Sequence, residues 1–345
     1  MHIYAEAISG LIGFARAELA GLSGRIEFLP EQQPDALRFT YRGDIRSLLG
    51  LRSVVAVYLA ETFPVPRPRG LLGNQHFAGL SAMVETVRRL HPPGAFRTLR
   101  LSAAGEGSAV MARLRDELAA STKLRAMGEE ADMLLRLRPA PGGWEALARI
   151  SPRPLTARPW RVCNMPGALN PVVAHAMAAM SAPAPADRYL NLGCGSGTLM
   201  IEWLAVGPAQ LVVGCDLDPS ALACARQNLD AAGCPGLPLL RADAGLLPFP
   251  DASFDVLTAD LPFGRLVGTH AGNEQLYPRL LAEATRVAAP GARLLLVTHE
   301  VRLLERLLGS PPLSAAWETV AVLRVKLPFG AGGLNPRIYH LRRMP

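Results

Sequence analysis

The sequence is poor in lysine and lacks any long apolar run. Lys123 and Lys326 are its only lysines, so nearly all of its 36 basic residues are arginines. No apolar run reaches the roughly 18 residues needed to span a bilayer, which excludes an ordinary membrane-spanning helix. The opening stretch, residues 1–6, has neither the basic nor the apolar region of a secretory signal. We therefore expect a cytoplasmic protein.

The cysteines form no C-x-x-C pair, which argues against the common zinc and dithiol motifs. They are odd in number and lie beside small or apolar residues: Cys163, Cys194, Cys215, Cys224 and Cys234. We expect all of them to be reduced, structural thiols. The seven histidines are scattered rather than clustered at ligand spacing, so no metal site is expected.

The positive charge is concentrated in the first half of the chain. Residues 1–160 hold 21 Lys and Arg against 15 Asp and Glu, whereas residues 161–345 hold 15 against 14. Because the planar guanidinium fork suits bidentate contacts with phosphate, this excess favours a nucleic-acid partner. An arginine-rich composition with solvated charged faces is the alternative explanation.

A chain of 345 residues, half of them hydrophobic, is long enough for two folded domains. Residues 151–161 carry three prolines and no hydrophobic period, which is typical of a linker. Strand-like and helix-like runs are mixed upstream of it, which predicts an α+β domain. The strand-like runs are 3–7 and 95–102, and the helix-like runs are 13–22 and 110–127. A second proline-rich stretch, residues 63–70, divides this half in two.

Strand-like and helix-like runs alternate downstream of the linker, which predicts an α/β domain with a parallel sheet and right-handed crossovers. The predicted strands are 189–192, 210–215, 237–241, 254–259 and 292–298. The predicted helices are 198–205, 219–232 and 273–288. Two further β-like runs, 319–327 and 337–342, predict an antiparallel hairpin at the end.

A glycine-rich turn follows the first strand of this domain. Residues 193–198 have the sequence Gly-Cys-Gly-Ser-Gly-Thr, and glycines at such a turn let the backbone approach a ligand closely. A dinucleotide site of the G-x-G-x-x-G kind needs a third glycine where Thr198 stands. The spacing instead resembles the S-adenosylmethionine loop of methyltransferases. A simple tight turn is the alternative.

Acidic residues follow the next two strands. Asp216 lies nineteen residues after Gly197, where a carboxylate can accept hydrogen bonds from both ribose hydroxyls. Asp218 precedes Pro219 and is expected to cap the following helix. Asp243 is a candidate acceptor for an adenine amino group, with a bond to local backbone as the alternative.

The most specific motif is Asp260-Leu261-Pro262-Phe263-Gly264, directly after the fourth strand. It resembles the [DN]-P-P-[YF] motif of methyltransferases that act on planar exocyclic amines. Such an amine is a poor nucleophile, because its lone pair is delocalised into the ring. By the logic of the motif, the Asp260 carboxylate and the Leu261 carbonyl accept the amine hydrogens and aim the nitrogen lone pair at the methyl donor. Phe263 would stack on the base, and an ordinary turn is the alternative.

The residues after this motif are weaker candidates. Arg265 and the loop 268–273 could contact the substrate backbone, although a surface loop explains them equally well. His175 is expected to be a surface or packing residue. No histidine is assigned a role, because this chemistry needs orientation more than a strong base.

Over nearly its whole length the chain resembles the THUMP-domain tRNA guanine-N2-methyltransferases. The resemblance rests on the motif at Asp260, on the glycine loop, and on residues 158–161 and 166–171, which are similar to the start of that family's catalytic domain. It implies a ferredoxin-like subdomain over residues 1–62, a THUMP RNA-binding domain over 63–150, a linker over 151–165, and a Rossmann-like methyltransferase domain over 166–345.

The resemblance also implies the site residues and the partner. The catalytic turn comprises Asp260, Leu261, Pro262 and Phe263. The S-adenosylmethionine site comprises Asn191, Gly193, Gly195, Gly197, Thr198, Asp216, Leu217, Asp243, Ala244 and Asp260. The implied partner is the acceptor stem of tRNA, with no metal, membrane or protein partner.

Leu261 occupies a position that is proline in many adenine and glutamine methyltransferases. The form D-[LM]-P-F-G resembles the branch that makes N2-methylguanosine at position 6 of tRNA, and a related branch acts on position 10. A base in a stem must leave its stack, at a cost of a few kcal/mol, which phosphate contacts of the basic first half would offset. The alternatives are methylation of adenine N6 or of protein glutamine, a non-catalytic RNA-binding protein, and a nicotinamide-dependent oxidoreductase.

Overall fold

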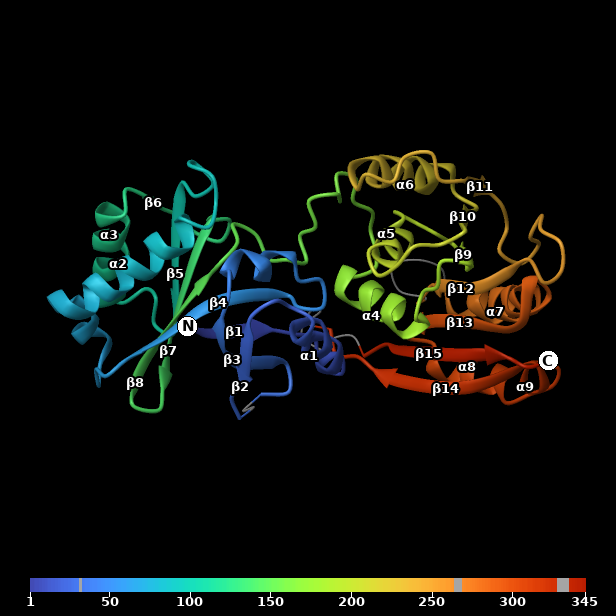
Figure 1. Cartoon of the computed structure of the whole chain (residues 1–345), viewed down its shortest axis with the longest axis horizontal. Helices are drawn as coiled ribbons and strands as arrows, with labels where there is room; N and C mark the ends of the chain where they lie inside the picture. Colours follow the sequence, from blue (N-terminus) through green and yellow to red (C-terminus); the bar gives the residue numbers. More distant parts are fainter. Residues whose placement is uncertain (31–32, 264–268, 328–334) are drawn as a thin grey trace. The chain divides into compact units, whose positions relative to one another are not determined.

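The computed structural model describes residues 1–30, 33–263, 269–327 and 335–345. The chain forms two compact units, the first made of residues 1–7 and 15–157 and the second of residues 8–14 and 158–345. Figure 1 shows the elements of each. Within the described ranges, no helix combines the length and the apolar character that a membrane span requires.

The first unit is built on an eight-stranded sheet in the order β2-β3-β1-β4-β8-β7-β5-β6. Its strands are β1 (His2–Glu6), β2 (Arg25–Phe28), β3 (Ala36–Arg42), β4 (Ala56–Phe63), β5 (Thr98–Ala103), β6 (Arg125–Ala126), β7 (Met133–Ala140) and β8 (Gly143–Arg149). The helical segments in this part of the chain are α1 (Ile12–Ala20), η1 (Ile45–Gly50), η2 (Pro68–Leu72), α2 (Asn74–Arg88) and α3 (Ala109–Ser121). The sequence analysis divided this half of the chain near residue 63. Because β4 pairs with β8, the strands before and after that point belong to one sheet.

Successive side chains of each strand point to opposite faces of this sheet. One face carries apolar side chains such as Leu59, Leu101 and Leu135, which are buried where α2 and α3 pack against the strands (Figure 1). The other face carries tyrosine, arginine and glutamate side chains, described below. Burial of the apolar face is the main favourable contribution to the folding of this unit.

The predicted helix over residues 110–127 is too long at its carboxyl end. The helix α3 stops at Ser121, and Lys123 adopts a left-handed φ of 55°. The Leu124 N–H then closes the helix by donating to the Ala119 carbonyl, 2.9 Å away. Leu124 is nevertheless buried. The apolar pattern in the sequence therefore continues past the end of the helix, which is why the predicted helix was too long.

The second unit is built on a seven-stranded sheet in the order β11-β10-β9-β12-β13-β15-β14. Its strands are β9 (Arg188–Leu192), β10 (Leu211–Asp216), β11 (Leu239–Arg241), β12 (Phe254–Asp260), β13 (Ala288–Thr298), β14 (Trp317–Arg324) and β15 (Arg337–Arg343). Its helices are α4 (Pro171–Ser181), α5 (Thr198–Leu204), α6 (Pro219–Ala231), α7 (His270–Val287), α8 (Val301–Leu308) and α9 (Leu313–Ala316).

The strands from β9 to β13 are parallel, and β15 is antiparallel to both β13 and β14. One face of the sheet packs in a core with α5 and α6, which includes Tyr189 and Trp203. The other packs with α7, α8 and α9 in a core that includes Leu190 and Leu281. The predicted Rossmann-like sheet with a terminal antiparallel hairpin is therefore confirmed. The helix α7 begins three residues earlier than predicted, after the cap Thr269.

The second unit begins at Arg158, inside the segment expected to be a linker. The Arg158 guanidinium donates to the Glu202 carboxylate at 2.8 Å, and both side chains are buried. Trp160 is buried in the core with Trp203. These contacts involve specific side chains of α5, which the proline content of the segment does not reveal.

Residues 8–14 also pack with the second unit. Ser9 forms a β-bridge with Lys326. Gly10 has a φ of 94°, and a Cβ atom at this position would lie 1.9 Å from the Arg324 carbonyl oxygen. Only glycine fits here, because both the backbone conformation and the close approach exclude a side chain.

The expectation that every cysteine is reduced is wrong for Cys163 and Cys224, which form a disulfide with their Cα atoms 5.4 Å apart. The pair is 61 residues apart in the sequence and meets only because the segment before α4 packs on α6. Asn228 strengthens this contact, since its amide exchanges two 2.9 Å hydrogen bonds with the Cys163 backbone. Cys194 and Cys215 are buried free thiols, as expected.

Replacing both disulfide cysteines, Cys163→Ser with Cys224→Ser, should lower the stability of the oxidised protein by about 2–4 kcal/mol, because the crosslink restricts the unfolded chain. The measurement is the melting temperature with and without a dithiol reductant. The parent protein should lose stability on reduction and the double variant should not respond. The matched control is Cys234→Ser, which removes a free thiol. A parent protein that ignores the reductant would contradict the prediction.

Candidate functional site

The carboxyl ends of the five parallel strands β9 to β13 lie at one edge of the second sheet. β9 lies between β10 and β12, and its Leu192 is in register with both Cys215 and Ala259. Asp216 and Asp260, each the last residue of its strand, therefore flank the glycine loop that follows β9. Open α/β sheets bind ligands at this edge. The structure thus brings together the residues that the sequence analysis selected.

The glycine loop holds three left-handed residues, Gly193, Gly195 and Gly197, with φ values of 59°, 53° and 78°. Other residues would be strained in this conformation. A Cβ atom on Gly193 or Gly195 would meet no described atom within 4 Å, so the loop faces open space. A ligand can therefore approach the backbone here. Gly197 instead packs against Ala225 and is the N-cap residue of α5.

Asp216 is tied to this loop. Its Oδ2 accepts a hydrogen bond from the Gly195 N–H at 2.8 Å, and its Oδ1 accepts one from the Asp218 N–H at 3.0 Å. A carboxylate oxygen can accept more than one hydrogen bond, so Asp216 can still receive ribose hydroxyls. Asp218 caps α6 by accepting from the Ser220 N–H, as predicted. The neighbouring Leu217 is 62% exposed and available to a planar ligand.

Two buried polar groups lie beside the glycine loop. Asn191 is fully buried and donates from Nδ2 to the Thr258 carbonyl, but its Oδ1 has no hydrogen-bond partner among the described residues. A buried acceptor of this kind is usually satisfied by a ligand or by water. Thr198 accepts a 2.8 Å hydrogen bond from Arg161 Nη2, a contact that the sequence analysis missed.

Asp243 lies at the same edge but is engaged locally. Its Oδ1 accepts from the Gly245 N–H at 2.8 Å, and its Oδ2 pairs with Arg279 at 2.7 Å. The Gly245 N–H, followed by Arg279, holds the pKa of Asp243 below its usual range. The local contact that the sequence analysis kept as an alternative is present, and Ala244 beside it is half-buried. The cofactor role of both stays a prediction.

Asp260 is the most perturbed acid of the site. Its Oδ1 atom is buried without a hydrogen-bond partner among the described residues. Burial raises the pKa of Asp260 to about 7, because the ionised form is poorly solvated there. A strongly perturbed acid with no partner among the residues described, located where open α/β sheets bind ligands, is a candidate for a functional role.

The rest of the turn is firmly held. The Leu261 N–H donates to the Val297 carbonyl at 3.0 Å, and the Leu261 side chain is buried. The Phe263 ring is half-buried and meets the His299 ring edge-to-face, with centroids 5.0 Å apart. Gly264, Arg265 and Gly268, which were also considered, lie outside the described residues.

The sequence analysis missed two residues of α7 that contact this turn. Asn273 Nδ2 and the Tyr277 hydroxyl each donate to the Pro262 carbonyl oxygen at 2.8 Å. They are four residues apart, and this spacing on one helix face was the available signal. His175, by contrast, is buried and lies 3.3 Å from Glu202, in keeping with a packing role.

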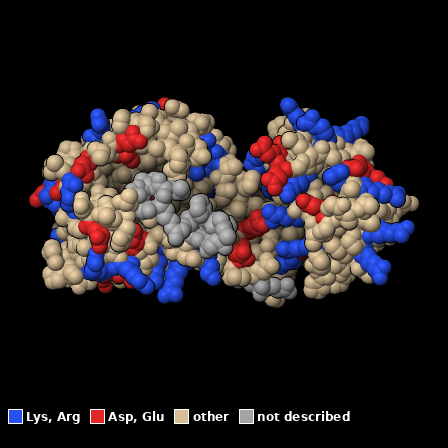
Figure 2. Space-filling model, turned by 180° about the vertical axis from the view of Figure 1, so that it is seen from behind, with Lys and Arg blue, Asp and Glu red and all other residues tan. Residues whose placement is uncertain are grey.

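The first unit carries a second group of polar residues on the uncovered face of its sheet. Strand register places Arg38, Arg100, Arg136 and Arg138 on this face together with Tyr4, Tyr58, Glu6 and Glu145. We call these four arginines the arginine face. They outnumber the two glutamates, so the group is positive overall. Figure 2 shows one side of the molecule, on which basic and acidic side chains are also interspersed.

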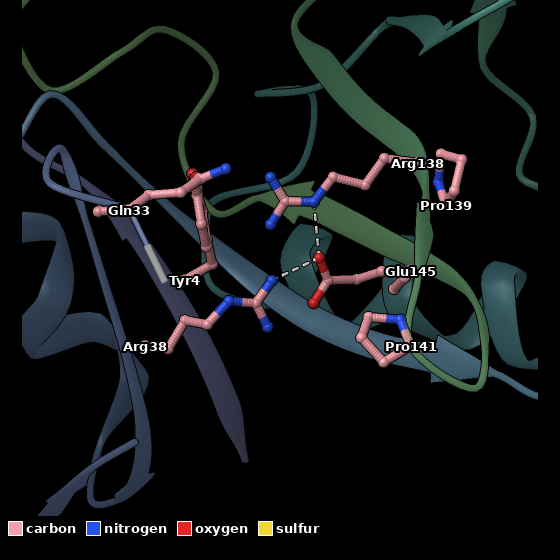
Figure 3. Close-up of a pocket in the computed structure, with 9 residues that line it drawn as sticks. Tyr4, Gln33, Arg38, Arg138, Pro139, Pro141 and Glu145 are labelled. Carbon is pink, nitrogen blue, oxygen red and sulfur yellow. Dashed lines mark hydrogen bonds and ion pairs between the residues drawn. The ribbon is translucent and has the colours of Figure 1, made fainter. Parts of the chain in front are cut away.

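A pocket of about 140 Å³ opens among these residues. Figure 3 shows Arg38 and Arg138 reaching Glu145 from different strands, and each donates to its Oε2 at 2.7 Å. Both guanidinium groups also lie over the Tyr4 ring, at 5.4 and 4.6 Å from its centroid. Burial opposes ionisation of Glu145, but the two arginine bonds hold its pKa below the usual range. Each guanidinium keeps further N–H groups for an anionic ligand.

The edge of the second sheet fits S-adenosylmethionine. Its backbone is open above Gly193 and Gly195, its Asp216 carboxylate can take hydroxyl donors, and Asn191 offers an unsatisfied acceptor. These features match a ligand with a ribose and an amino-acid part, and no phosphate is needed to explain them. Gly193, Gly195, Asp216 and Asn191 are the residues that would hold it, and this assignment stays a prediction.

Residues 158–329 match the model of the UPF0020 family, described as an RMKL-like methyltransferase domain. A tRNA (guanine(6)-N2)-methyltransferase of Thermus thermophilus is 33% identical over 228 residues, which cover 64% of each chain. The mouse tRNA (guanine(6)-N(2))-methyltransferase THUMP3 is 29% identical over 191 residues, 52% of this chain and 37% of that protein. The chain thus matches less than two thirds of either relative.

The crystal structure of TrmN from Thermus thermophilus has a similar fold over its whole length. It superposes with a TM-score of 0.72 and covers 99% of both chains at 24% sequence identity. This similarity extends to the first unit, where the sequence signals were weakest. It supports the order and packing of the elements in both units.

Asp260→Asn should stabilise the protein at pH 8 and leave its stability nearly unchanged at pH 4. The folded state favours the neutral acid, so the parent protein loses stability as the pH rises from the unfolded pKa of about 3.9 to the folded pKa of about 7. The uncharged amide removes this loss, a gain of roughly 1–4 kcal/mol at pH 8. Thermal unfolding at both pH values measures it.

Asp255→Asn on the same strand is the matched control for this experiment. Its carboxylate bonds Arg188 at 2.9 Å, which holds the pKa of Asp255 below its usual range. This variant should therefore lose stability at pH 8, the opposite sign. Equal effects of Asp260→Asn at the two pH values would show that Asp260 is not a buried, perturbed acid.

Proposed function

The chain belongs to the UPF0020 family of RMKL-like methyltransferase domains through residues 158–329, and on this premise we propose that it methylates the exocyclic N2 amine of a guanosine in tRNA. It is a methyltransferase homologous to tRNA guanine-N2-methyltransferases, and S-adenosylmethionine is its methyl donor. The proposed target is guanosine 6 of the acceptor stem. Leu261 supports position 6, because it gives the motif the form found in that branch.

The observation that carries the proposal is the Asp260 carboxylate at the end of β12, whose Oδ1 is buried with no hydrogen-bond partner in the part of the chain that the structure describes. A planar amine has two hydrogens, and its nitrogen lone pair becomes reactive only when those hydrogens are held in place. The Asp260 carboxylate and the Leu261 carbonyl are the two proposed acceptors. Holding the amine in this way contributes orientation, which can account for much of the rate of such a reaction.

The methyl donor supplies an electrophilic methyl group bound to a sulfonium sulfur. The residues of the turn act on the other reactant. Asp260 would accept a hydrogen bond from the amine and take up the proton that the nitrogen loses as it becomes methylated. A pKa of about 7 suits this role, because the carboxylate is ionised in a useful fraction at neutral pH and binds a proton with little loss. Phe263 would stack on the purine.

The first unit is the part of the chain that we propose binds the RNA. We assign residues 1–62 to a ferredoxin-like subdomain and residues 63–150 to a THUMP domain, with 151–165 linking them to the methyltransferase domain at 166–345. The support is the basic first half and the arginine face with its interleaved tyrosines. Phosphate contacts by such arginines would offset the cost of moving the target base out of its stack.

Transfer of labelled methyl groups to an unmodified tRNA transcript should yield N2-methylguanosine at position 6. A transcript with inosine at that position is the matched control, because inosine lacks only the N2 amine and should accept no label. Asp260→Ala should reduce turnover by about 100-fold or more while cofactor affinity stays near the parent value. Label in adenosine, or full turnover by the variant, would contradict the proposal.

Arg38→Gln combined with Arg138→Gln should weaken binding of the same transcript by about tenfold or more and make it less dependent on salt, because fewer counterions are released. The control is Arg113→Gln with Arg115→Gln, which removes two arginines from α3 on the opposite face of the same sheet. Titrations at several salt concentrations measure both effects. Equal weakening by the two pairs would count against a specific role for the arginine face.

A further inference from the structure

We propose that Asn273 and Tyr277 of α7 are positioning residues that hold the Leu261 carbonyl in place for the substrate amine. This inference rests on the proposed function, because it concerns the same turn. Neither side chain contacts the reacting atoms. Both act through the backbone of Pro262, the next residue.

The Pro262 carbonyl is held from two sides. Asn273 Nδ2 and the Tyr277 hydroxyl both donate to its oxygen at 2.8 Å, so both lone pairs of the carbonyl are used. Asn273 is 1% exposed and Tyr277 is fully buried. Two buried donors that converge on one carbonyl fix the orientation of the peptide between Pro262 and Phe263.

The peptide before Leu261 is fixed as well. The Leu261 N–H donates to the Val297 carbonyl at 3.0 Å, which attaches that peptide to β13. The Leu261 carbonyl therefore lies between two anchored peptides. The ring of Pro262 also fixes its own φ, which restricts rotation about the N–Cα bond next to the Leu261 carbonyl. A small rotation of either anchor would move the carbonyl relative to Asp260, and the two proposed acceptors would no longer match the amine.

The hydrogen-bond partners of the Tyr277 hydroxyl determine the direction in which it donates. A hydroxyl has one hydrogen, and the carbonyl can only accept, so the Tyr277 hydrogen goes to Pro262. The Thr298 hydroxyl, 2.8 Å away, must then donate to Tyr277. Thr298 in turn accepts the Glu300 N–H at 2.9 Å. A chain of hydrogen bonds with the same direction strengthens each member.

Asn273 has a second contact that fixes its amide. Its Nδ2 also lies 3.5 Å from the Glu300 carboxylate, which identifies this atom as the nitrogen. The His270 ring bonds the same carboxylate at 3.0 Å. The first turn of α7 and the end of β13 are thus joined to the catalytic turn through one hydrogen-bond network, which helix packing alone would not require.

Tyr277→Phe should lower kcat about tenfold and leave the KM for tRNA and the affinity for S-adenosylmethionine within twofold, because orientation is lost while binding surfaces stay. Asn273→Ala should act in the same way. Thr298→Val should reproduce part of the loss, and the conservative Thr298→Ser, which keeps the hydroxyl, should restore it. Steady-state kinetics and equilibrium cofactor binding measure these values.

Tyr339→Phe is the matched control. Tyr339 is a buried tyrosine of β15 whose hydroxyl donates to Glu305, away from the turn. This variant should keep the parent kcat. Amide hydrogen exchange adds a measurement that needs no substrate, because exchange of the Leu261 and Phe263 amides should become faster in Tyr277→Phe and not in Tyr339→Phe.

The outcomes separate the two proposals. A Tyr277→Phe protein with the parent kcat and unchanged exchange in the turn would overturn the positioning role and leave the proposed function standing. Tyr277→Phe could show faster exchange in the turn while the parent enzyme methylates a nucleoside other than guanosine. That result would support the positioning role and contradict the proposed substrate. A kcat loss shared equally by Tyr339→Phe would overturn the role, because it would indicate a general effect of removing a buried hydroxyl.

Discussion

The parallel pairing of β9 with both β10 and β12 is the constraint on which the site depends. It places Asp216 and Asp260 at the same edge as the glycine loop, although they are 44 residues apart in the sequence. A slip of one residue in either pair would turn one acid toward a helix layer, because side chains alternate between the faces. The buried apolar residues of the two cores, Leu190 and Tyr189 among them, specify this register.

Much of the second unit could be predicted because its signals are local. Strand-helix alternation, the glycine spacing and the cap at Asp218 each lie within a short stretch, and the structure contains all three. The turn at Asp260 was proposed as a site for the same reason, since its residues are contiguous, and its functional role stays a prediction. Its burial and raised pKa were not foreseeable, because they depend on neighbours that come from other strands.

The features that the sequence analysis missed or mispredicted are set by tertiary contacts. The Cys163–Cys224 disulfide joins segments whose approach depends on how α6 packs. Trp160 lies among three prolines and is nevertheless buried. The arginine face could be anticipated only as a net charge, because the register of the neighbouring strands β3, β1, β4, β8, β7 and β5 decides which arginines share a face. Sequence patterns describe one element at a time, and these contacts join several.

The chemistry of the arginine face has a consequence for how the two units respond to their surroundings. A guanidinium stays charged throughout the physiological pH range, and it is not a substrate for lysine acylation. The two lysines of the chain, Lys123 and Lys326, lie outside this face. The positive charge of the face is therefore permanent, whereas Asp260 gains and loses its charge near neutrality. If the arginine face binds RNA and Asp260 acts as proposed, a fall in pH would slow the chemical step while the RNA stays bound, because different groups would govern RNA binding and turnover.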